Sequence, residues 1–421
     1  MKKLIYKFLL LCFAMAHCLP GQSQVLSFQE YLNNVKNNNI HYLVEKYNVD
    51  IADANIQAVK VFPDPNLSLS ATDNQQETLK MGYSFDAFLG YTIELGGKRK
   101  ARIQLAQSQK ELTNAQIEDF FRNLRAEAVI YYLNALKQKQ LLEISISSYD
   151  QMKRLAEADS IRFKSGEIAE VDAMQSKLEA NTMWNDLEQN RADYANALIE
   201  LSVYQGDKNF TNIDSISGKL SYQKRTFDLS SLIITAQNNR ADLQAALMSK
   251  EVSAKTLQLA RANRAIDLGI NIGATHNTIV KNEIAPAPAF TGVTAGISIP
   301  LKFSNRNKGE IKAAQYAVKQ SEASYSAVEI QIGKEVTQAY HTYQSACRQV
   351  EQFQTKILSD AATILKNKIY SYQRGETTSH DVLSAERDYN DIFQNYFQTL
   401  YNSMASLVEL ERACGIWDIE L

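Results

Sequence analysis

A stretch of sequence that occurs twice constrains the fold of this 421-residue chain more than any other feature. The first copy spans residues 162–178 and the second spans residues 371–387. An offset of 209 residues (375 − 166) aligns identical or similar residues: Gly166 with Gly375, Glu167 with Glu376, Asp172 with Asp381, and Phe163 with Tyr372. A match at one fixed, long offset predicts an internal tandem duplication. A chance similarity between two helix turns is the alternative.

Each copy contains a glycine that stands alone between two long stretches without glycine or proline. These stretches cover residues 98–165 and 167–205 in the first half, and residues 334–374 and 376–414 in the second. A single glycine between such segments predicts a left-handed residue in a tight turn between two helices. Each copy is therefore expected at the tip of a long helical hairpin. Asp172 and Asp381 would lie in the first turns of the returning helices, where a carboxylate favours the helix dipole.

Composition excludes some classes of protein. The net charge is −2 and the isoelectric point about 6.3, so the chain lacks the basic footprint of a nucleic-acid-binding protein. With 45% hydrophobic and 22% charged residues, the chain has the composition of a folded protein.

Residues 1–23 are predicted to be a signal peptide. Lys2, Lys3 and Lys7 precede an apolar run over residues 8–16, and small residues follow at Gly21 and Ser23. The mature protein would then begin near Gln24, and lipid attachment at Cys18 is the alternative. Beyond the leader only Cys347 and Cys414 remain, and their spacing matches no metal site. We expect two buried thiols, with a disulfide as the other possibility.

Four segments alternate between apolar and small or polar residues, which is typical of β-strands with two different faces. They cover about 67–73 and 83–95 in the first half, and about 266–276 and 291–301 in the second. No later window has the 18 or so apolar residues of a membrane-spanning helix, so any membrane crossing must use strands. The pattern favours a membrane barrel with a wet lumen. An ordinary antiparallel sheet with one solvated face is the alternative.

Four strands are too few to close a barrel, since the smallest membrane barrels have about 8. Open sheet edges are not tolerated in lipid, so the chain is expected to assemble. A dimer with 8 strands and a trimer with 12 strands both satisfy closure.

The remaining segments are organised around the long helices. Residues 24–215 are predicted to form the first repeat, with an N-terminal helix over 27–60 and long helices over 98–165 and 167–205. Residues 216–421 would form the second, with helices over 231–264, 309–374 and 376–414, and Asn238–Asn239 matching Asn38–Asn39. Apolar stripes between wide polar faces indicate coiled-coil-like packing into a hollow helical cylinder. The non-periodic residues 206–230 are expected to form a small collar of mixed structure.

The order of these features resembles that of TolC-type outer-membrane efflux proteins, the outer membrane factor family. The resemblance lies in the proline-containing helix end before the first strand, the Glu94–Arg99 run, Pro300–Leu301, the Asn305–Glu310 run and the paired Gly-Glu tips. It covers essentially the whole mature chain. The Glu94–Arg99 run is similar to the heavy-metal branch, which serves cobalt-zinc-cadmium or copper-silver efflux.

The resemblance implies a mainly α-helical homotrimer in the outer membrane of a Gram-negative bacterium. Its four strands per chain would build a 12-stranded β-barrel, and its hairpins a trimeric α-helical tunnel in the periplasm. The implied function is a passive exit channel of a tripartite efflux pump. Its partners would be a periplasmic adaptor and an inner-membrane pump, often of the resistance-nodulation-division class, which together choose the cargo.

The resemblance also implies roles at the tips. Phe163, Gly166, Glu167, Tyr372, Gly375 and Glu376 match the surface that docks onto the adaptor, and Asp172, Asp381 and Ser384 match the gate or constriction. Asp172 and Tyr372 match positions that hold family members closed, and Asp381 matches an acidic ring. Ser384 stands where some members carry a second acid, and Thr377 replaces a basic residue that braces the tip. In the alternative interpretation, both aspartates only stabilise the starts of the helices in which they lie.

No enzyme chemistry is predicted. The four histidines beyond the leader stand alone in their segments, and no catalytic triad, phosphate-binding loop or paired-histidine metal motif is present. We expect no cofactor and no metal. A barrel-anchored structural or adhesive coiled-coil rod is the main alternative function, and a periplasmic enzyme or binding module is a further one.

Overall fold

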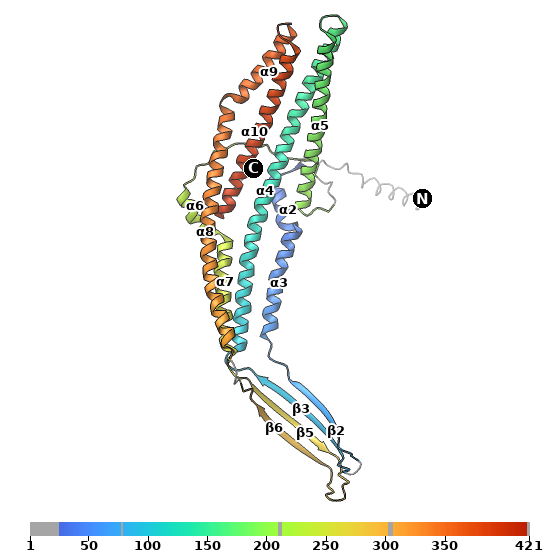
Figure 1. The fold of residues 1–421 in the computed structure, drawn as a ribbon, viewed down its shortest axis with the longest axis vertical. Coiled ribbons are helices and arrows are strands. Elements are labelled where there is room, and N and C mark those ends of the chain that lie inside the picture. Colours follow the sequence, from blue (N-terminus) through green and yellow to red (C-terminus); the bar gives the residue numbers. More distant parts are fainter. Residues whose placement is uncertain (1–24, 77–78, 209–212, 302–305, 419–421) are drawn as a thin grey trace, which may run out of the picture. The chain divides into compact units, whose positions relative to one another are not determined.

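The computed structural model describes residues 25–76, 79–208, 213–301 and 306–418, and Figure 1 shows them as a ribbon. The predicted signal peptide and Cys18 lie outside the described residues. The chain is divided into two compact units, and each unit contains segments from both halves of the sequence. One unit holds residues up to Val44, 119–240 and 331 onward, and the other holds residues 45–118 and 241–330.

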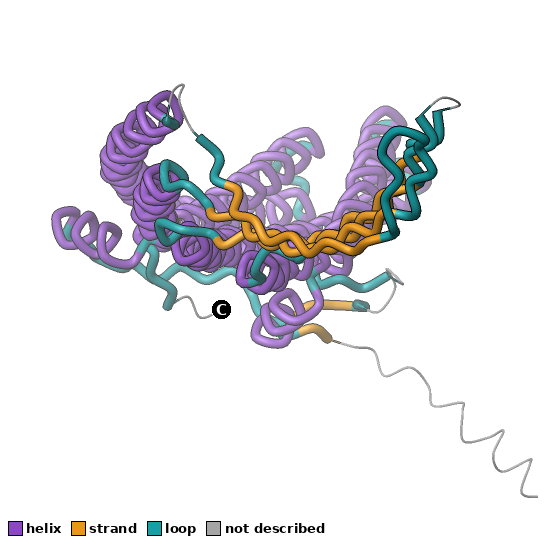
Figure 2. Tube along the Cα trace, turned by 90° about the horizontal axis from the view of Figure 1, so that it is seen from below, coloured by secondary structure: helices purple, strands orange, loops and turns teal. Residues whose placement is uncertain are grey.

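The second unit contains a four-stranded antiparallel sheet in the order β2-β3-β5-β6. Its strands are β2 (Asn66–Asp73), β3 (Tyr83–Ile93), β5 (Leu268–Asn277) and β6 (Phe290–Ser298). Figure 2 shows these strands following a curved arc. The four predicted strands are therefore present, although β3 ends two residues early and β6 ends at Ser298 instead of residue 301.

The two faces of this sheet differ in chemistry. On one face Leu67, Leu89 and Ile272 lie side by side across β2, β3 and β5, and all three side chains are exposed. On the other face Asp86 accepts hydrogen bonds from the hydroxyls of Ser70 (3.0 Å) and Thr275 (2.6 Å). The sheet thus presents an uncovered apolar face and an internally hydrogen-bonded polar face, as the alternating pattern predicts.

Ion pairs join this sheet to the helices of the same unit. The Lys98 ammonium lies 2.6 Å from Asp267, which precedes β5, and the Arg102 guanidinium lies 2.5 Å from Glu94, which follows β3. Lys98 is the first residue of helix α4 (Lys98–Lys164). The Glu94–Arg99 run therefore fixes the joint where a strand gives way to a long helix. None of the described helices is both long enough and apolar enough to cross a membrane.

The sequence predicted one helix over residues 27–60 and one over residues 231–264, and the structure shows two helices in each range. Each is interrupted at one residue: α2 (Phe28–Asn38) and α3 (Ile40–Lys60) flank Asn39, and α6 (Leu229–Asn239) and α7 (Ala241–Ala262) flank Arg240. Both break residues have extended backbone, with ψ of 122° and 125°. The structure thus aligns Asn39 with Arg240, and the predicted match of Asn38–Asn39 with Asn238–Asn239 is one residue out of register.

The two breaks make the same contact in both repeats. The Asn39 amide donates to the carbonyl of Tyr204 at 2.8 Å, and the Arg240 guanidinium donates to the carbonyl of Ala413 at 3.1 Å. Two residues after each acceptor stands a glycine with positive φ, Gly206 and Gly415. Each glycine packs against the backbone of its break. This repeated contact supports the internal duplication.

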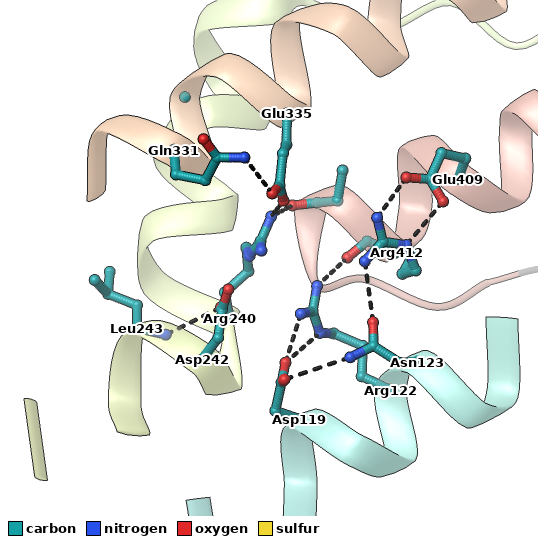
Figure 3. A network of polar contacts seen from close by, with 12 residues as sticks. Asp119, Arg122, Asn123, Arg240, Asp242, Leu243, Gln331, Glu335, Glu409 and Arg412 are labelled. Atoms are coloured by element: carbon teal, nitrogen blue, oxygen red, sulfur yellow. Dashed lines mark hydrogen bonds and ion pairs between the residues drawn. The ribbon is translucent and has the colours of Figure 1, made fainter. Parts of the chain in front are cut away.

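Arg240 also belongs to a polar network around the end of helix α10 (Ser379–Cys414), shown in Figure 3. Its guanidinium donates to Glu335 at 2.7 Å. Arg412 donates to Asn123 at 3.0 Å, and Arg122 donates to the carbonyl of Arg412 at 2.7 Å. These contacts join α4, α8 (Lys308–Gln352) and α10 at Arg240, the residue that interrupts the N-terminal helices of the second repeat.

The core of the first unit surrounds Tyr132, whose hydroxyl donates to the carbonyls of Leu26 (3.2 Å) and Ser217 (2.8 Å). These acceptors lie in or beside two short parallel strands, β1 (Val25–Leu26) and β4 (Ser215–Ile216). The strand pair belongs to the collar of mixed structure expected near residues 206–230. Cys347 and Cys414 are buried free thiols, as predicted.

The long helices of the hairpins differ between the repeats. Helix α4 is continuous over 67 residues. The single helix predicted over 309–374 is instead divided into α8 (Lys308–Gln352), a π-helical segment η1 (Phe353–Ile357) and α9 (Leu358–Gln373). A π-helical turn contains an extra residue, and no glycine or proline marks it here. The returning helices, α5 (Glu170–Tyr204) and α10, begin three residues later than predicted.

Candidate functional site at the hairpin tips

Both hairpin turns have the same backbone geometry. Gly166 and Gly375 adopt φ of +80° and +76°. The amide after each glycine donates to a carbonyl five residues back: Glu167 to Arg162 at 2.8 Å, and Glu376 to Ser371 at 2.9 Å. This hydrogen bond is characteristic of a helix ended by a left-handed residue. The glycines are thus required by the turn, because other residues rarely adopt positive φ.

The tip of the first hairpin exposes an aromatic ring and a carboxylate. Phe163 is 40% exposed. Glu167 accepts a hydrogen bond from the Ser165 hydroxyl (3.1 Å) and lies 3.4 Å from the Arg162 guanidinium. At the second tip, the exposed Glu376 lies 3.7 Å from Arg374. Both tips therefore present a weakly paired glutamate to their surroundings.

Asp381 is the third residue of the helix that returns from the second tip, and it forms a capping box with Thr378, the N-cap residue. Its carboxylate accepts from the hydroxyls of Thr377 (2.7 Å) and Thr378 (2.8 Å) and from the amide of Thr378 (3.2 Å). Lys368 lies 3.3 Å away. The threonine hydrogen bonds, and then Lys368, lower the pKa of Asp381 well below its usual value. Within one chain these contacts oppose the rise in pKa that a ring of three Asp381 carboxylates would cause.

Asp172 occupies the equivalent position in the first hairpin but has no equivalent cap. The N-cap of α5 is Ala169, which makes no side-chain hydrogen bond there. Asp172 instead accepts a long hydrogen bond of 3.5 Å from the hydroxyl of Ser379, the first residue of α10. The two aspartates are thus aligned by the repeat but have different surroundings. Ser384, the third predicted gate residue, is an exposed residue of α10.

Tyr372 lies inside the pair of hairpins and is only 5% exposed. Its hydroxyl donates to Asp159 of α4 at 2.6 Å, and the Arg162 guanidinium lies 4.9 Å from the centre of its ring. Burial and the hydrogen bond to Asp159 raise the pKa of Tyr372. Tyr372 therefore joins the two hairpins through its hydrogen bond to Asp159 and its contact with Arg162.

Asp159 was not among the residues singled out from the sequence. The only available signal was a difference between the repeats. The residue aligned with Asp159 is Lys368, and the residue aligned with Tyr372 is Phe163. Neither partner of this hydrogen bond has the same residue type at the aligned position of the other repeat.

Further along the hairpins a second set of contacts joins the repeats. The Arg387 guanidinium of α10 forms a two-pronged ion pair with Glu179 of α5, with one contact at 2.9 Å. The Ser148 hydroxyl of α4 donates to the side-chain oxygen of Asn390 in α10 at 2.6 Å. The tips and their first turns are therefore held together within one chain by side chains from both repeats.

Paired hairpins, a two-faced sheet and an internal duplication define a channel of the outer-membrane efflux class. The family model for "Outer membrane efflux protein" matches residues 32–207 and 232–416, so the chain belongs to this family. The match confirms the predicted membership of this family and the predicted location in the outer membrane. The family is one of efflux proteins and not of enzymes.

Individual relatives agree with this assignment. The chain is 22% identical to the cobalt-zinc-cadmium resistance protein CzcC of Cupriavidus metallidurans, over 96% of both chains. It is also 22% identical to the outer membrane protein TolC of Vibrio cholerae, over 75% of this chain and 70% of that protein. The solved structure of CusC superposes with a TM-score of 0.74 at 16% identity, covering 92% of each chain.

Proposed function

We propose that this protein is the outer-membrane exit channel of a tripartite efflux pump and works as a homotrimer. The observation that carries this proposal is the sheet with an exposed apolar face and a polar face. Its edge strands in the described structure are β2 and β6. An open edge leaves backbone groups unpaired, which is not tolerated in lipid, so further copies must pair with these edges. Three copies would supply the 12 strands of a closed barrel.

The hairpins would form the helical tunnel of the channel, in the periplasm. Their tips would dock onto a periplasmic adaptor through Phe163, Glu167 and Glu376, on turns shaped by Gly166 and Gly375. Tyr372 would support this surface from inside, because it is buried against Asp159. The adaptor would link the channel to an inner-membrane pump of the resistance-nodulation-division type. Conduction through the channel itself would be passive and require no cofactor.

The gate would lie in the first turns of the returning helices. Asp381 would supply a ring of three carboxylates that favours cations, because its low pKa keeps it ionised. Ser384 would add no second acidic layer, and Asp172 would contribute through its contact with Ser379.

Heavy-metal ions are the cargo class that the similarities favour. CzcC is described as a cobalt-zinc-cadmium resistance protein, and its match to this chain is almost full length. The Glu94–Arg99 run, which resembles the heavy-metal branch, has a structural role at the strand-to-helix joint through Glu94 and Lys98. The adaptor and pump would select the ion.

The first experiment measures stoichiometry and conductance on the same purified, detergent-extracted sample. Native mass spectrometry is expected to give three chains per particle, and planar-bilayer recordings are expected to show ion conduction. A monomer without conductance would overturn the proposal, because the sheet would then be an ordinary antiparallel sheet with one solvated face.

A further inference from the structure

A cavity of about 350 Å³ lies beside the Tyr372–Asp159 hydrogen bond, between α4, α9 and α10. Its walls include the apolar side chains of Met152, Leu155 and Val382. The volume is in the range of small-molecule binding sites, and apolar walls with a few polar groups are typical of such sites. This cavity lies within one chain, and Tyr372 lies between it and the tip surface proposed for docking.

Two buried carboxylates line this cavity. Asp159 is fully buried and Glu386 is 2% exposed. In the described part of the chain, neither Oδ2 of Asp159 nor Oε1 of Glu386 has a hydrogen-bond partner. A buried acceptor without a partner costs free energy, so each such atom calls for an explanation. An occupant of the cavity that donates hydrogen bonds would satisfy both.

The surroundings of Glu386 indicate that a positive charge is missing. Burial raises its pKa, and the hydrogen bonds from Ser148 and Asn390 offset this effect only in part. The cationic residues that line the cavity are already engaged: Arg162 packs over the Tyr372 ring, and Arg154 donates to the carbonyl of Asp150 at 3.2 Å. A ligand that carries a positive charge and donates hydrogen bonds would compensate the carboxylate of Glu386.

A bare metal ion fits this cavity poorly. Among the described residues, no group of three or more His, Cys, Asp or Glu side chains could hold a metal ion. Apolar walls offer no ligands to a metal, whereas they stabilise a hydrocarbon body. An aromatic ring such as that of Tyr372 also attracts ammonium groups.

We propose that this cavity binds a small organic cation, an ammonium group attached to an apolar body, with the ammonium donating to Asp159 and Glu386. The occupant would bridge α4 of the first hairpin to α9 and α10 of the second. It would thereby hold the two hairpins of one chain together beside the Tyr372–Asp159 contact. The proposal concerns one chain and does not depend on the channel function.

The test uses calorimetric titration of the purified full-length protein with phenethylamine. Two molecules of similar shape serve as comparisons: neutral 2-phenylethanol and anionic 3-phenylpropionate. We expect saturable binding of the amine, binding of the alcohol at least about tenfold weaker, and no binding of the acid, because a charge-assisted hydrogen bond is stronger than a neutral one. Equal binding of amine and alcohol, or no saturable binding of the amine, would overturn the proposal.

Variants then locate the site. Asp159→Asn and Glu386→Gln are each expected to weaken amine binding about tenfold or more. Asp388→Asn, an exposed carboxylate on the same helix as Glu386, is the matched control and should leave binding unchanged. Val382→Phe would fill the cavity and abolish binding while both carboxylates remain. This variant tests the site even if a carboxylate variant fails to fold. Undiminished binding in Val382→Phe would place the amine elsewhere and refute the assignment.

Discussion

The Tyr372 hydroxyl lies 2.6 Å from Oδ1 of Asp159 and joins α9 of the second hairpin to α4 of the first. Both side chains are buried, so the contact is shielded from water. In the second hairpin, Lys368 pairs with Asp381 of the same hairpin. The aligned residues of the first hairpin, Asp159 and Asp172, are both acidic and cannot pair in this way. Asp159 therefore takes its donor from the other hairpin.

Removing this hydrogen bond should loosen the hairpins. In Tyr372→Phe the buried Asp159 carboxylate loses its donor, at a cost of about 1–3 kcal/mol of unfolding free energy. If the contact restrains the tips, single-channel conductance in planar bilayers should also rise. Tyr370→Phe removes a hydroxyl from an exposed ring of the same helix and is the control. Identical stability and conductance in both variants would show that the contact restrains nothing.

The glycines of the tips can be tested through resistance. Gly166→Val and Gly375→Val place a β-branched residue at positive φ and should distort the turns. We expect loss of pump-dependent resistance with normal assembly in the membrane. Gly333→Val lies inside α8, where an added Cβ has open space, and serves as the control. Full resistance in both tip variants would remove the tips from the docking hypothesis.

Asp381 is expected to affect both stability and ion selectivity. Asp381→Ala removes the carboxylate half of the capping box with Thr378, the N-cap residue, and should lower the melting temperature. In reversal-potential measurements across a salt gradient the variant should lose cation preference. Asp172→Ala removes the aligned carboxylate, which makes no cap, and should change stability less. Unchanged selectivity in Asp381→Ala would exclude an acidic ring.

The close approach of Gly206 to the first helix break gives a prediction about packing. A Cβ at Gly206 would lie 2.3 Å from the carbonyl oxygen of Asn38, whereas a Cβ at Gly415 would lie 3.2 Å from the nearest atom, a backbone carbon of Asn239. Both positions also have positive φ, which costs other residues about 1–2 kcal/mol. Gly206→Ala should therefore destabilise more than Gly415→Ala in thermal unfolding. The reverse order would mean that the break shifts easily to accommodate a side chain.

Glu411 should make stability depend on pH. Burial raises its pKa to about 8, the nearby Asp418 carboxylate adds to the rise, and Arg225 opposes it. Because the folded state holds the proton more tightly than the unfolded state, this contribution is complete below an unfolded pKa of about 4.3. It is lost as the pH rises toward 8. Glu411→Gln should flatten this part of the curve of Tm against pH, and the exposed Glu200→Gln should not. Parallel curves for all three proteins would contradict the assignment.

The sequence predicted the hairpin tips and the strands because each depends on a local pattern. Gly166 and Gly375 are lone glycines in long helical stretches, and the strands alternate between apolar and polar residues. Such signals lie within a few neighbouring residues, and they identified the fold class.

Features that depend on tertiary contacts were missed. The breaks at Asn39 and Arg240 carry no glycine or proline, and they depend on acceptors at Tyr204 and Ala413. The π-helical segment has no local marker either. Asp159 lies 213 residues from Tyr372, so no sequence window contains both partners.

The duplication also carries a consequence for how this gene evolves. Phe163 has no hydroxyl to donate and Lys368 has no carboxylate to accept, so neither half contains both partners of the Tyr372–Asp159 contact. Copying the first half over the second by gene conversion would leave two aspartates and two phenylalanines, with no donor. Copying the second over the first would leave two tyrosines and two lysines, with no acceptor. At these positions recombination between the halves in either direction would therefore remove the contact that joins the two hairpins.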